Sequence, residues 1–354
     1  MGDNIYYMVL VAAGLACLLP YKKQKNASTL FLICMMLICG FRAYDVGVDT
    51  HNYVAYAASR YVDDYKWGPI FLGLKMIAEF FPEPETPFLM LMSILTFAPL
   101  IYITRRYSAY PAMSVLMFII PVADYFVQSM NIARQSIAIV VVLCAAVMIA
   151  EQKKKLATYL IILAFFFHPY TFPSVILLFF DKINLTIKGV YITIGISMIV
   201  GLVGTLSGIQ EFLNMMMLIT ADSQNELILK LGKYGDYDII SGFSIIGQLS
   251  HMLPIAAMCI LGANKETINT TYFKLMFFGC LATNIFVSVI FCERIASTFT
   301  IAQLLAVPYI YKTSTLRKRK LIVMLLLLTA LLFMYNLKCN SQLDLWNPYH
   351  TIFD

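Results

Sequence analysis

The chain has 354 residues, of which 60% are hydrophobic and only 13% are charged. Soluble domains carry about 25% charged residues, so this composition excludes an ordinary soluble protein and indicates one integral membrane domain spanning residues 1–354. A net charge of +6 would suggest nucleic acid in a soluble protein. Here it reflects basic cytoplasmic loops, so we expect a lipid bilayer and no nucleic acid as partner.

The first apolar run, residues 5–20, has no basic region before it and no small-residue cleavage site after it. It is therefore predicted to be a retained helix rather than a signal peptide. The eight cysteines lie mostly inside apolar segments, with no CxxC pair and no metal spacing. We expect buried thiols, no disulfide framework and no metal. No HExxH, DxD or GxxxxGK motif is present, so we expect no cofactor and no ATP hydrolysis.

Hydropathy predicts the membrane segments in chain order at residues 5–20, 28–41, 87–104, 111–128, 132–150, 156–180, 189–207, 243–262, 272–291, 295–311 and 320–337. Lys and Arg favour cytoplasmic loops, which places the basic clusters at 22–25, 105–106, 153–155 and 317–320 inside. A single helix over 156–180 would put the last cluster outside. His168-Pro169 interrupts that segment, because Pro disfavours helix at the residue before it. Two short helices, about 156–167 and 171–181, that meet at an outer apex restore the pattern.

The prediction is an all-α polytopic membrane protein of about twelve segments, some short and broken, with both termini outside. Cytoplasmic loops then hold 16 Lys and Arg against 3 Asp and Glu, whereas the outer side holds 9 and 17, with Lys274 inside a helix. Short, broken helices are tolerated where they line a cavity. We therefore expect His168 inside a cavity that opens to the outer side.

Two outer loops are long, over residues 42–86 and 208–242. In the first, apolar residues recur with a helical period over about 68–81, with Lys75 and Glu79 on the other face. A short interfacial helix is predicted there. The second loop is polar, aromatic and Gly-spaced, and it contains Tyr234 and Tyr237. This suits either a carbohydrate-facing lip or a plain solvated loop.

The stretch FRAYDVGVDTHNY, residues 41–53, follows directly on an apolar run and is unusually rich in charged and aromatic residues. Charged residues at membrane helix ends mark functional sites, because their burial is costly. Arg42, Arg134, His168 and the Glu293-Arg294 pair, predicted as a tight outer turn, all fall at similar depth on the outer side. Three arginines there suggest a diphosphate ligand, since the guanidinium fork matches phosphate oxygens. The alternative is that each arginine pairs with Asp45, Asp49 or Glu293, or extends to headgroups.

His168 is a candidate general base, because its unperturbed pKa lies near neutrality. The alternative is a packed or helix-capping histidine. Asp49 is the rival base or acceptor-orienting group. His251 lacks charged neighbours and is interpreted as structural.

Several motifs arrive in an order that resembles the EpsG-type branch of the Wzy-like polysaccharide polymerases. They are FRAYDVGVDTHNY, the segment from Trp67 to Phe71, NIARQSIAIVVVLCAA, KKKLATYLIILAFFFHPYTF, ERIASTFTIAQLLAVPYI and NPYHTIFD. The family commonly has Glu-Pro-Gly-Phe where this chain has Trp67-Gly68-Pro69-Ile70, and a small or polar residue where it has Pro169.

The resemblance implies a GT-C-like, metal-independent glycosyltransferase of the bacterial cytoplasmic (inner) membrane, with an active site that faces outward. It would join undecaprenyl-diphosphate-linked oligosaccharide units into a capsular, exo- or O-antigen polysaccharide, served by a flippase and a chain-length regulator. The alternatives are an O-antigen-ligase-like enzyme, a lipid-linked oligosaccharide flippase or transporter, and a scaffold of capsule assembly.

For this function the expected roles are as follows. Arg42, Arg134 and Arg294 hold the diphosphate, and His168 activates the acceptor hydroxyl, with Asp49 as the alternative. The sugar path is lined by Tyr53, Gln135, Glu293, Tyr234 and Tyr237.

Overall fold

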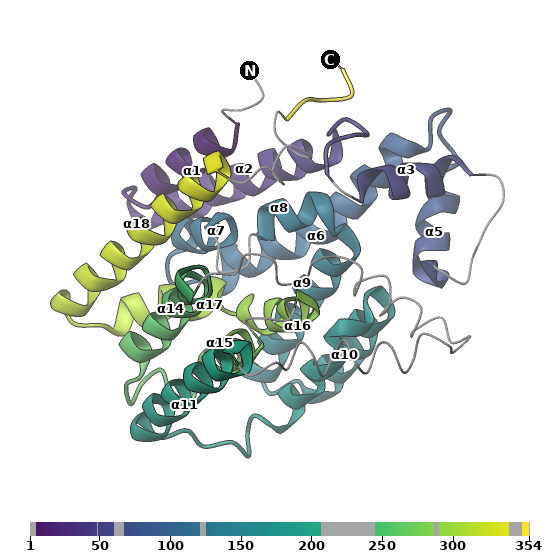
Figure 1. Ribbon diagram of the computed structural model, residues 1–354. Coiled ribbons are helices and arrows are strands. Elements are labelled where there is room, and N and C mark those ends of the chain that lie inside the picture. The colour runs from purple at the N-terminus through teal and green to yellow at the C-terminus, as the bar shows by residue number, and fades with distance from the viewer. Residues whose placement is uncertain are drawn as a thin grey trace.

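The computed structural model describes residues 5–47, 49–59, 67–120, 125–206, 245–286, 290–339 and 349–353. Within these ranges the chain is helical, and the one extended pairing is an antiparallel bridge between Arg42 and Thr351 (Figure 1). The helices in chain order are α1 Ile5–Ala16, α2 Tyr21–Gly40, α3 Thr50–Ala58, α5 Pro69–Ala78, α6 Glu85–Tyr107, α7 Pro111–Ile119, α8 Tyr125–Asn131, α9 Ala133–Ala150, α10 Lys154–Phe167, the 3-10 helix η2 Pro169–Phe179, α11 Ile187–Leu206, α14 Ile245–Gly262, α15 Thr271–Ile285, α16 Ile290–Thr300, α17 Gln303–Thr313 and α18 Leu316–Cys339.

Helix α9 is the centre of the fold. After Ser136 it consists of small and branched apolar residues, and 14 of its 18 residues are buried. A helix that is apolar all round must be covered on every side. Accordingly α9 contacts α6, α8, α10, η2, α15 and α16, and it lies in the middle of the molecule in Figure 1. The residues at either end of α9 are therefore held in place by the core.

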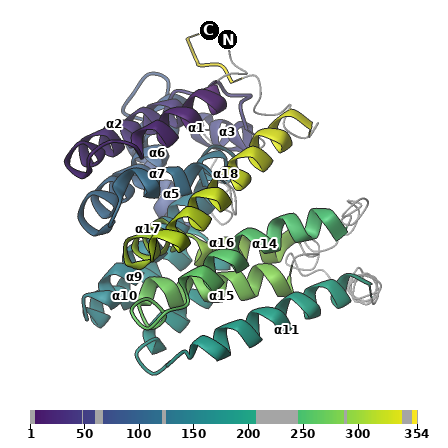
Figure 2. The same cartoon turned by 90° about the vertical axis from the view of Figure 1, so that its left-hand side faces the viewer.

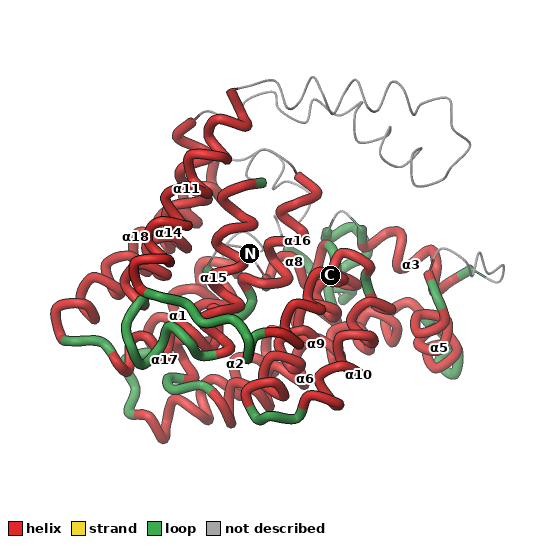
Figure 3. The backbone as a smooth tube through the Cα atoms, turned by 90° about the horizontal axis from the view of Figure 1, so that it is seen from below, coloured by secondary structure: helices red, strands yellow, loops and turns green. Residues whose placement is uncertain are grey.

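The other helices pack around this centre on two sides. Helices α11, α14 and α15 contact one another and stand side by side in Figures 2 and 3. Helices α3 and α5 lie at the opposite side of the molecule, where both contact α6. The short helices of the loop 42–86 thus lie against α6, the long helix that follows it.

The predicted break before Pro169 is confirmed. Helix α10 ends at Phe167, and His168 is extended, with φ −157° and ψ 123°. The chain then continues as η2, with Pro169 at its start and Pro173 inside it. Proline lacks the backbone N–H that an α-helical hydrogen bond requires, which accounts for the change of helix type. His168 is consequently held between two short helices.

Two local predictions were wrong. Glu293 and Arg294 do not form a turn, because both lie within α16. Lys75 does not face water either: it is 1% exposed, its ammonium donates to the Ser59 carbonyl, and it lies 5.0 Å from the Tyr56 ring centre. On the apolar face of α5, Phe71, Leu74 and Ala78 are buried, whereas Ile77 is 48% exposed.

The surface of the protein is apolar over wide areas. Large exposed apolar side chains follow α10, α11 and α18, among them Ile162, Ile196 and Leu327. Soluble monomers rarely expose such continuous patches, so contact with lipid explains them. In the described part of the chain, α6 and α9 are long and apolar enough to cross a membrane, and several shorter apolar helices accompany them. The chain is a helical membrane protein; the twelve crossings and the GT-C-like arrangement stay predictions.

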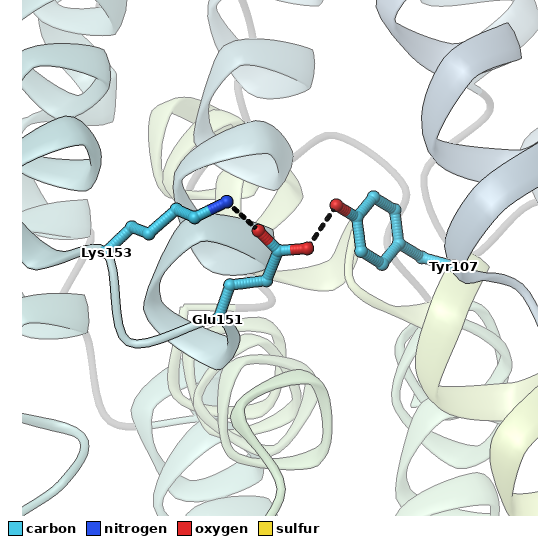
Figure 4. Close-up of polar contacts among 3 residues, drawn as sticks. All are labelled: Tyr107, Glu151 and Lys153. Atoms are coloured by element: carbon cyan, nitrogen blue, oxygen red, sulfur yellow. Dashed lines mark hydrogen bonds and ion pairs between the residues drawn. The ribbon is translucent and has the colours of Figure 1, made fainter.

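A polar contact joins the ends of α6 and α9 (Figure 4). Glu151, just after α9, accepts a hydrogen bond from the Tyr107 hydroxyl and pairs with the Lys153 ammonium. This end of α9 carries the basic residues that the sequence places in the cytoplasm. The functional candidates gather at the other end.

Candidate functional site

The turn from Phe41 to Thr50 is anchored on the junction between α8 and α9. Gly47 has φ +99°, and a Cβ there would lie 2.8 Å from the Asn131 Oδ1 atom. Only glycine meets both demands without strain. The Thr50 hydroxyl donates to the Val46 carbonyl at 2.7 Å, which closes the turn. The turn therefore places the start of α3 close to the start of α9.

Arg42 is the most enclosed of the candidate arginines, with 1% exposure. Its Nε donates to the Thr50 hydroxyl at 3.0 Å, and its Nη1 donates to the Cys39 carbonyl. Its Nη2 is buried without a hydrogen-bond partner among the described residues. Two of its donors are thus committed to the protein, and they hold the turn.

Asp49 is half-buried at the N-cap of α3, and its side chain makes no capping hydrogen bond. Burial raises the pKa of its carboxyl, against the opposing effects of Arg294, His51, a hydrogen bond from Asn52, and Arg134. Burial wins because it disfavours the charged form more than the surrounding charges favour it. The carboxylate therefore binds a proton more readily than an ordinary aspartate.

Arg134 is the second residue of α9 and lies against two neighbouring aromatic rings. Its guanidinium carbon is 5.1 Å from the ring centre of Trp67 and 4.9 Å from that of Phe71. Both distances allow cation–π attraction. The start of a helix also carries partial positive charge from unpaired N–H groups. An anion is favoured here by the side chain and by the helix together.

Arg294 is fixed through its backbone. Its carbonyl accepts hydrogen bonds from the Gln135 amide at 3.0 Å, the Ser297 hydroxyl at 2.8 Å and the Thr298 hydroxyl at 3.2 Å. Gln135 also donates to the Ser297 hydroxyl, so it joins α9 to α16. Its Oε1 is buried and has no partner within the described ranges. This bracket holds Arg134 and Arg294 on neighbouring helices.

His168 lies between α10 and η2 with its backbone locked. Its N–H donates to the Ala164 carbonyl at 2.9 Å, and its carbonyl accepts from Thr171. Its Nδ1 atom is buried without a hydrogen-bond partner in the part of the chain that the structure describes. Burial, followed by the charges of Arg134 and Arg294, lowers the pKa of the imidazole. Both effects favour the neutral imidazole.

Tyr53 and Trp67 form the aromatic side of the site. The Tyr53 hydroxyl hydrogen-bonds the Arg134 backbone, and burial raises its pKa to about 12. The Tyr53 and Trp67 rings meet edge-on with centres 5.6 Å apart, and Tyr56 stacks on Trp67 at 4.5 Å. The sequence analysis gave Trp67 and Phe71 no site role. No spacing in the sequence connects either residue with Arg134, so only the fold brings them together.

Four of the candidates lie within electrostatic reach of one another. The charges of Arg134 and Arg294 each act on both the Asp49 carboxyl and the His168 imidazole. Tyr53 bonds the Arg134 backbone and Gln135 bonds the Arg294 carbonyl, whereas Arg42 bonds Thr50 and the Cys39 carbonyl. The described residues contain no group of three or more His, Cys, Asp or Glu that would hold a metal. Tyr234, Tyr237 and the loop 208–242 lie outside the described residues, as does the Glu293 side chain.

Asp45, which the sequence analysis offered only as an arginine partner, pairs with His350 instead, at 2.8 Å. Both side chains are largely exposed. The contact brings the far end of the chain to the same turn.

Comparison with known proteins agrees with the resemblance that the motifs suggest. Searches of curated proteins and of solved structures returned no match. The profile of the EpsG family matches residues 25–351, which include every element of the site. The chain belongs to the EpsG family.

Proposed function

We propose that this protein is a polymerase that joins lipid-diphosphate-linked oligosaccharide units on the outer face of the bacterial cytoplasmic membrane. Membership of the EpsG family supports a glycosyl-transferring polymerase. The observation that carries the proposal is that the charges of Arg134 and Arg294 act on both Asp49 and His168, although the four residues come from four separate segments of the chain. Two fixed cations beside two proton-accepting groups suit transfer from an anionic leaving group.

Arg134 and Arg294 are assigned to the diphosphate of the donor. Guanidinium groups bind phosphate oxygens in pairs and stay charged. When the bond between the anomeric carbon and the phosphate oxygen breaks, negative charge builds up on the leaving undecaprenyl diphosphate. Cations already in place stabilise that charge without reorganisation. Arg42, which is buried and bonded to Thr50 and to the Cys39 carbonyl, is assigned instead to holding the turn that carries Asp49.

Asp49 is assigned as the acceptor of the proton. The hydroxyl of the acceptor sugar attacks the anomeric carbon, its proton passes to the Asp49 carboxylate, and the lipid diphosphate leaves. His168 is the alternative acceptor of this proton once the donor is bound. The donor's negative charge then opposes the effect of the two arginines, and the affinity of the imidazole for a proton increases.

Tyr53 and Gln135 are assigned to the wall of the sugar path beside this group. For Glu293, Tyr234 and Tyr237 the same assignment rests on the sequence alone. A flippase that delivers the donor and a chain-length regulator are the partners that the family assignment suggests. Transfer of one finished chain to another acceptor would be ligase chemistry at the same groups.

The test is elongation by the purified protein in lipid vesicles. Supplied with lipid-linked repeat units, the parent is expected to produce a ladder of products. Arg134→Ala should slow elongation about 10²- to 10³-fold, because a stabiliser of transition-state charge is lost. His168→Ala should lower it as well, while both variants still reach the membrane. Arg105→Ala is the matched control and should elongate normally. It removes an exposed cation in the last turn of α6, away from the site.

Each rival predicts a different result. A flippase would move the units across the vesicle membrane without converting them, and a scaffold would do neither. A ligase would transfer a finished chain but give no ladder. Normal elongation by both Arg134→Ala and His168→Ala would refute the site assignment.

A further inference from the structure

A short segment at the far end of the chain, Tyr349–Phe353, lies across the turn that carries Asp49. We call this segment the strap. The Ala43 N–H donates to the His350 carbonyl at 3.0 Å, and the Ile352 N–H donates to the Phe41 carbonyl at 3.1 Å. These two bonds flank the bridge between Arg42 and Thr351. The Phe41 and Phe353 rings, with centres 5.6 Å apart, close the same contact.

The strap also reaches the end of α2. The Tyr349 hydroxyl donates to the Ile38 carbonyl at 2.7 Å, and its ring is buried. The last carbonyls of a helix lack partners within the helix, so Tyr349 supplies one of them. The strap is thus tied both to α2 and to the turn that follows it.

Between the strap and the site stands Arg42. Its backbone pairs with Thr351 of the strap, and its side chain is 1% exposed. A buried guanidinium is stable only while its hydrogen bonds stay intact. Those bonds run to the Cys39 carbonyl and to the Thr50 hydroxyl. Opening the strap would admit water to Arg42 and weaken its hold on Thr50.

Thr50 transmits this contact to the site. It is the first residue of α3, its hydroxyl also contacts the Met130 carbonyl beside α9, and Asp49 directly precedes it. A shift of Thr50 therefore moves Asp49 relative to Arg134 and Arg294. Arg134 and Arg294 themselves are held by α9 and α16 through Gln135. They do not depend on the strap.

We propose that the strap is a positioning element of the active site: by closing over Arg42 it fixes Thr50, and through Thr50 it sets Asp49 against the two arginines. Only the last step, from Asp49 to catalysis, rests on the proposed function. The positioning groups are the Tyr349 hydroxyl and the backbone N–H of Ile352. The exposed pair of Asp45 and His350 is expected to contribute little, as exposed ion pairs usually do.

The first test measures closure of the strap without any enzyme assay. Ala43→Cys places a thiol at a position that is 8% exposed and lies under the strap. Its labelling by a membrane-impermeant maleimide is read above the signal of the eight natural cysteines. Adding Ile352→Pro removes the N–H that bonds Phe41, and labelling should become about tenfold faster, because the covered backbone opens. Ile352→Ala keeps that N–H and should stay within about twofold of the parent.

The second test measures catalysis in the same variants. Ile352→Pro should lower the turnover number about 10²-fold, because a catalytic group displaced by about 1 Å loses that much. The KM for the lipid-linked donor should stay within about twofold, since the arginines keep their places. Ile352→Ala and His350→Ala should retain turnover. A general loss of structure would change both constants and would not be rescued by alanine.

The outcomes distinguish a failure of the strap proposal from a failure of the proposed function. Equal labelling of the proline and alanine variants, or fast labelling with normal turnover, overturns the proposal. If the parent makes no polymer, the proposed function fails, while the labelling ratio still decides whether the strap closes over the turn. If Ile352→Pro does not reach the membrane, Tyr349→Phe takes its place. It removes only the donor to Ile38, and unchanged labelling of Ala43→Cys would then refute the proposal.

Discussion

Arg42 and Arg134 are the same residue type at the same predicted depth, but their surroundings differ. Arg42 commits two of its donors to Thr50 and to the Cys39 carbonyl, and almost none of it is exposed. Arg134 is half-buried against Trp67 and Phe71, and its charge reaches Asp49 and His168. Aromatic rings attract a guanidinium through their faces. Arg134 is therefore suited to a ligand, and Arg42 to the support of the turn.

The carboxyl of Asp49 gives a prediction about stability as well as activity. Because burial raises its pKa, the folded protein binds this proton more tightly than the unfolded chain does. Stability is then lost as the pH rises from the unfolded value through the folded pKa, and that loss persists at neutral pH. Asp49→Asn removes the charge, so its apparent unfolding temperature at pH 7 should exceed that of the parent. Below the unfolded pKa the two proteins should converge.

Asp49→Asn should also lower the rate of elongation by about 10²- to 10⁴-fold, as expected for the loss of a general base. In the parent, turnover should rise with pH through an apparent pKa above the usual aspartate range and then level off. The measurement is a pH–rate profile beside thermal unfolding in detergent. Asp45→Asn, the same change at an exposed position of the same turn, is the control. An Asp49→Asn protein that is less stable at pH 7, or fully active, would contradict this interpretation of the buried carboxyl.

Among the elements, α11 and α15 approach unusually closely. A Cβ on Gly201 of α11 would lie 1.9 Å from the Asn284 carbonyl oxygen of α15. The Asn284 amide meanwhile donates to the Ser197 hydroxyl at 2.9 Å, one turn earlier on α11. Small residues let membrane helices pack backbone to backbone, and polar side chains then bond across them. This pair of helices is therefore fixed by one glycine and one amide.

Gly201→Ala should consequently force the two helices apart. Overpacking of this kind costs about 1–3 kcal/mol, and the Ser197 contact would lengthen as well. Gly195→Ala is the matched control on the same helix, because a Cβ there meets nothing within 4 Å. The apparent unfolding temperature in detergent should fall for Gly201→Ala and stay level or rise for Gly195→Ala. Equal behaviour of the two variants would mean that the close approach does not stabilise the fold.

How far the elements can be predicted depends on the kind of signal. The long apolar runs that became α2, α6 and α9 are recognisable from hydropathy, and Pro169 marks the break before η2. The break between α16 and α17 at Ile301 cannot be recognised from the sequence, because no proline, glycine or charged residue stands there. Lys75 was placed on the wrong face. The period of the apolar residues shows which side of a helix is apolar, but it does not show that a cation is buried against an aromatic ring.

The site was predictable in part, for a similar reason. Charged residues at helix ends are candidates because their burial is costly, and this criterion identified Asp49, Arg134, His168 and Arg294. It does not distinguish an arginine that faces a ligand from one that faces the backbone, as Arg42 does. Nor does it reveal aromatic partners such as Trp67, whose neighbours are far away in the sequence.

For the molecule as a whole, α9 sets the scale. Its 18 residues rise about 27 Å, close to the roughly 30 Å of a hydrocarbon core. Arg134 stands at its start, whereas Glu151 and Lys153 follow its end. The site and the Lys153–Lys155 cluster are thereby separated by one membrane thickness. Because Lys and Arg clusters stay in the cytoplasm, the site is expected on the outer surface.

This orientation can be measured directly in intact cells. Tyr44→Cys places a thiol on the exposed part of the turn beside the site, and Lys153→Cys places one at the opposite end of α9. A membrane-impermeant maleimide should label the first in intact cells and the second only after the membrane is permeabilised. Each serves as the control for the other, since both positions are exposed and differ only in side. Labelling in the reverse order would place the arginines on the cytoplasmic side. An already translocated lipid-linked donor could not reach them there, and the proposal of an outward-facing polymerase would be refuted.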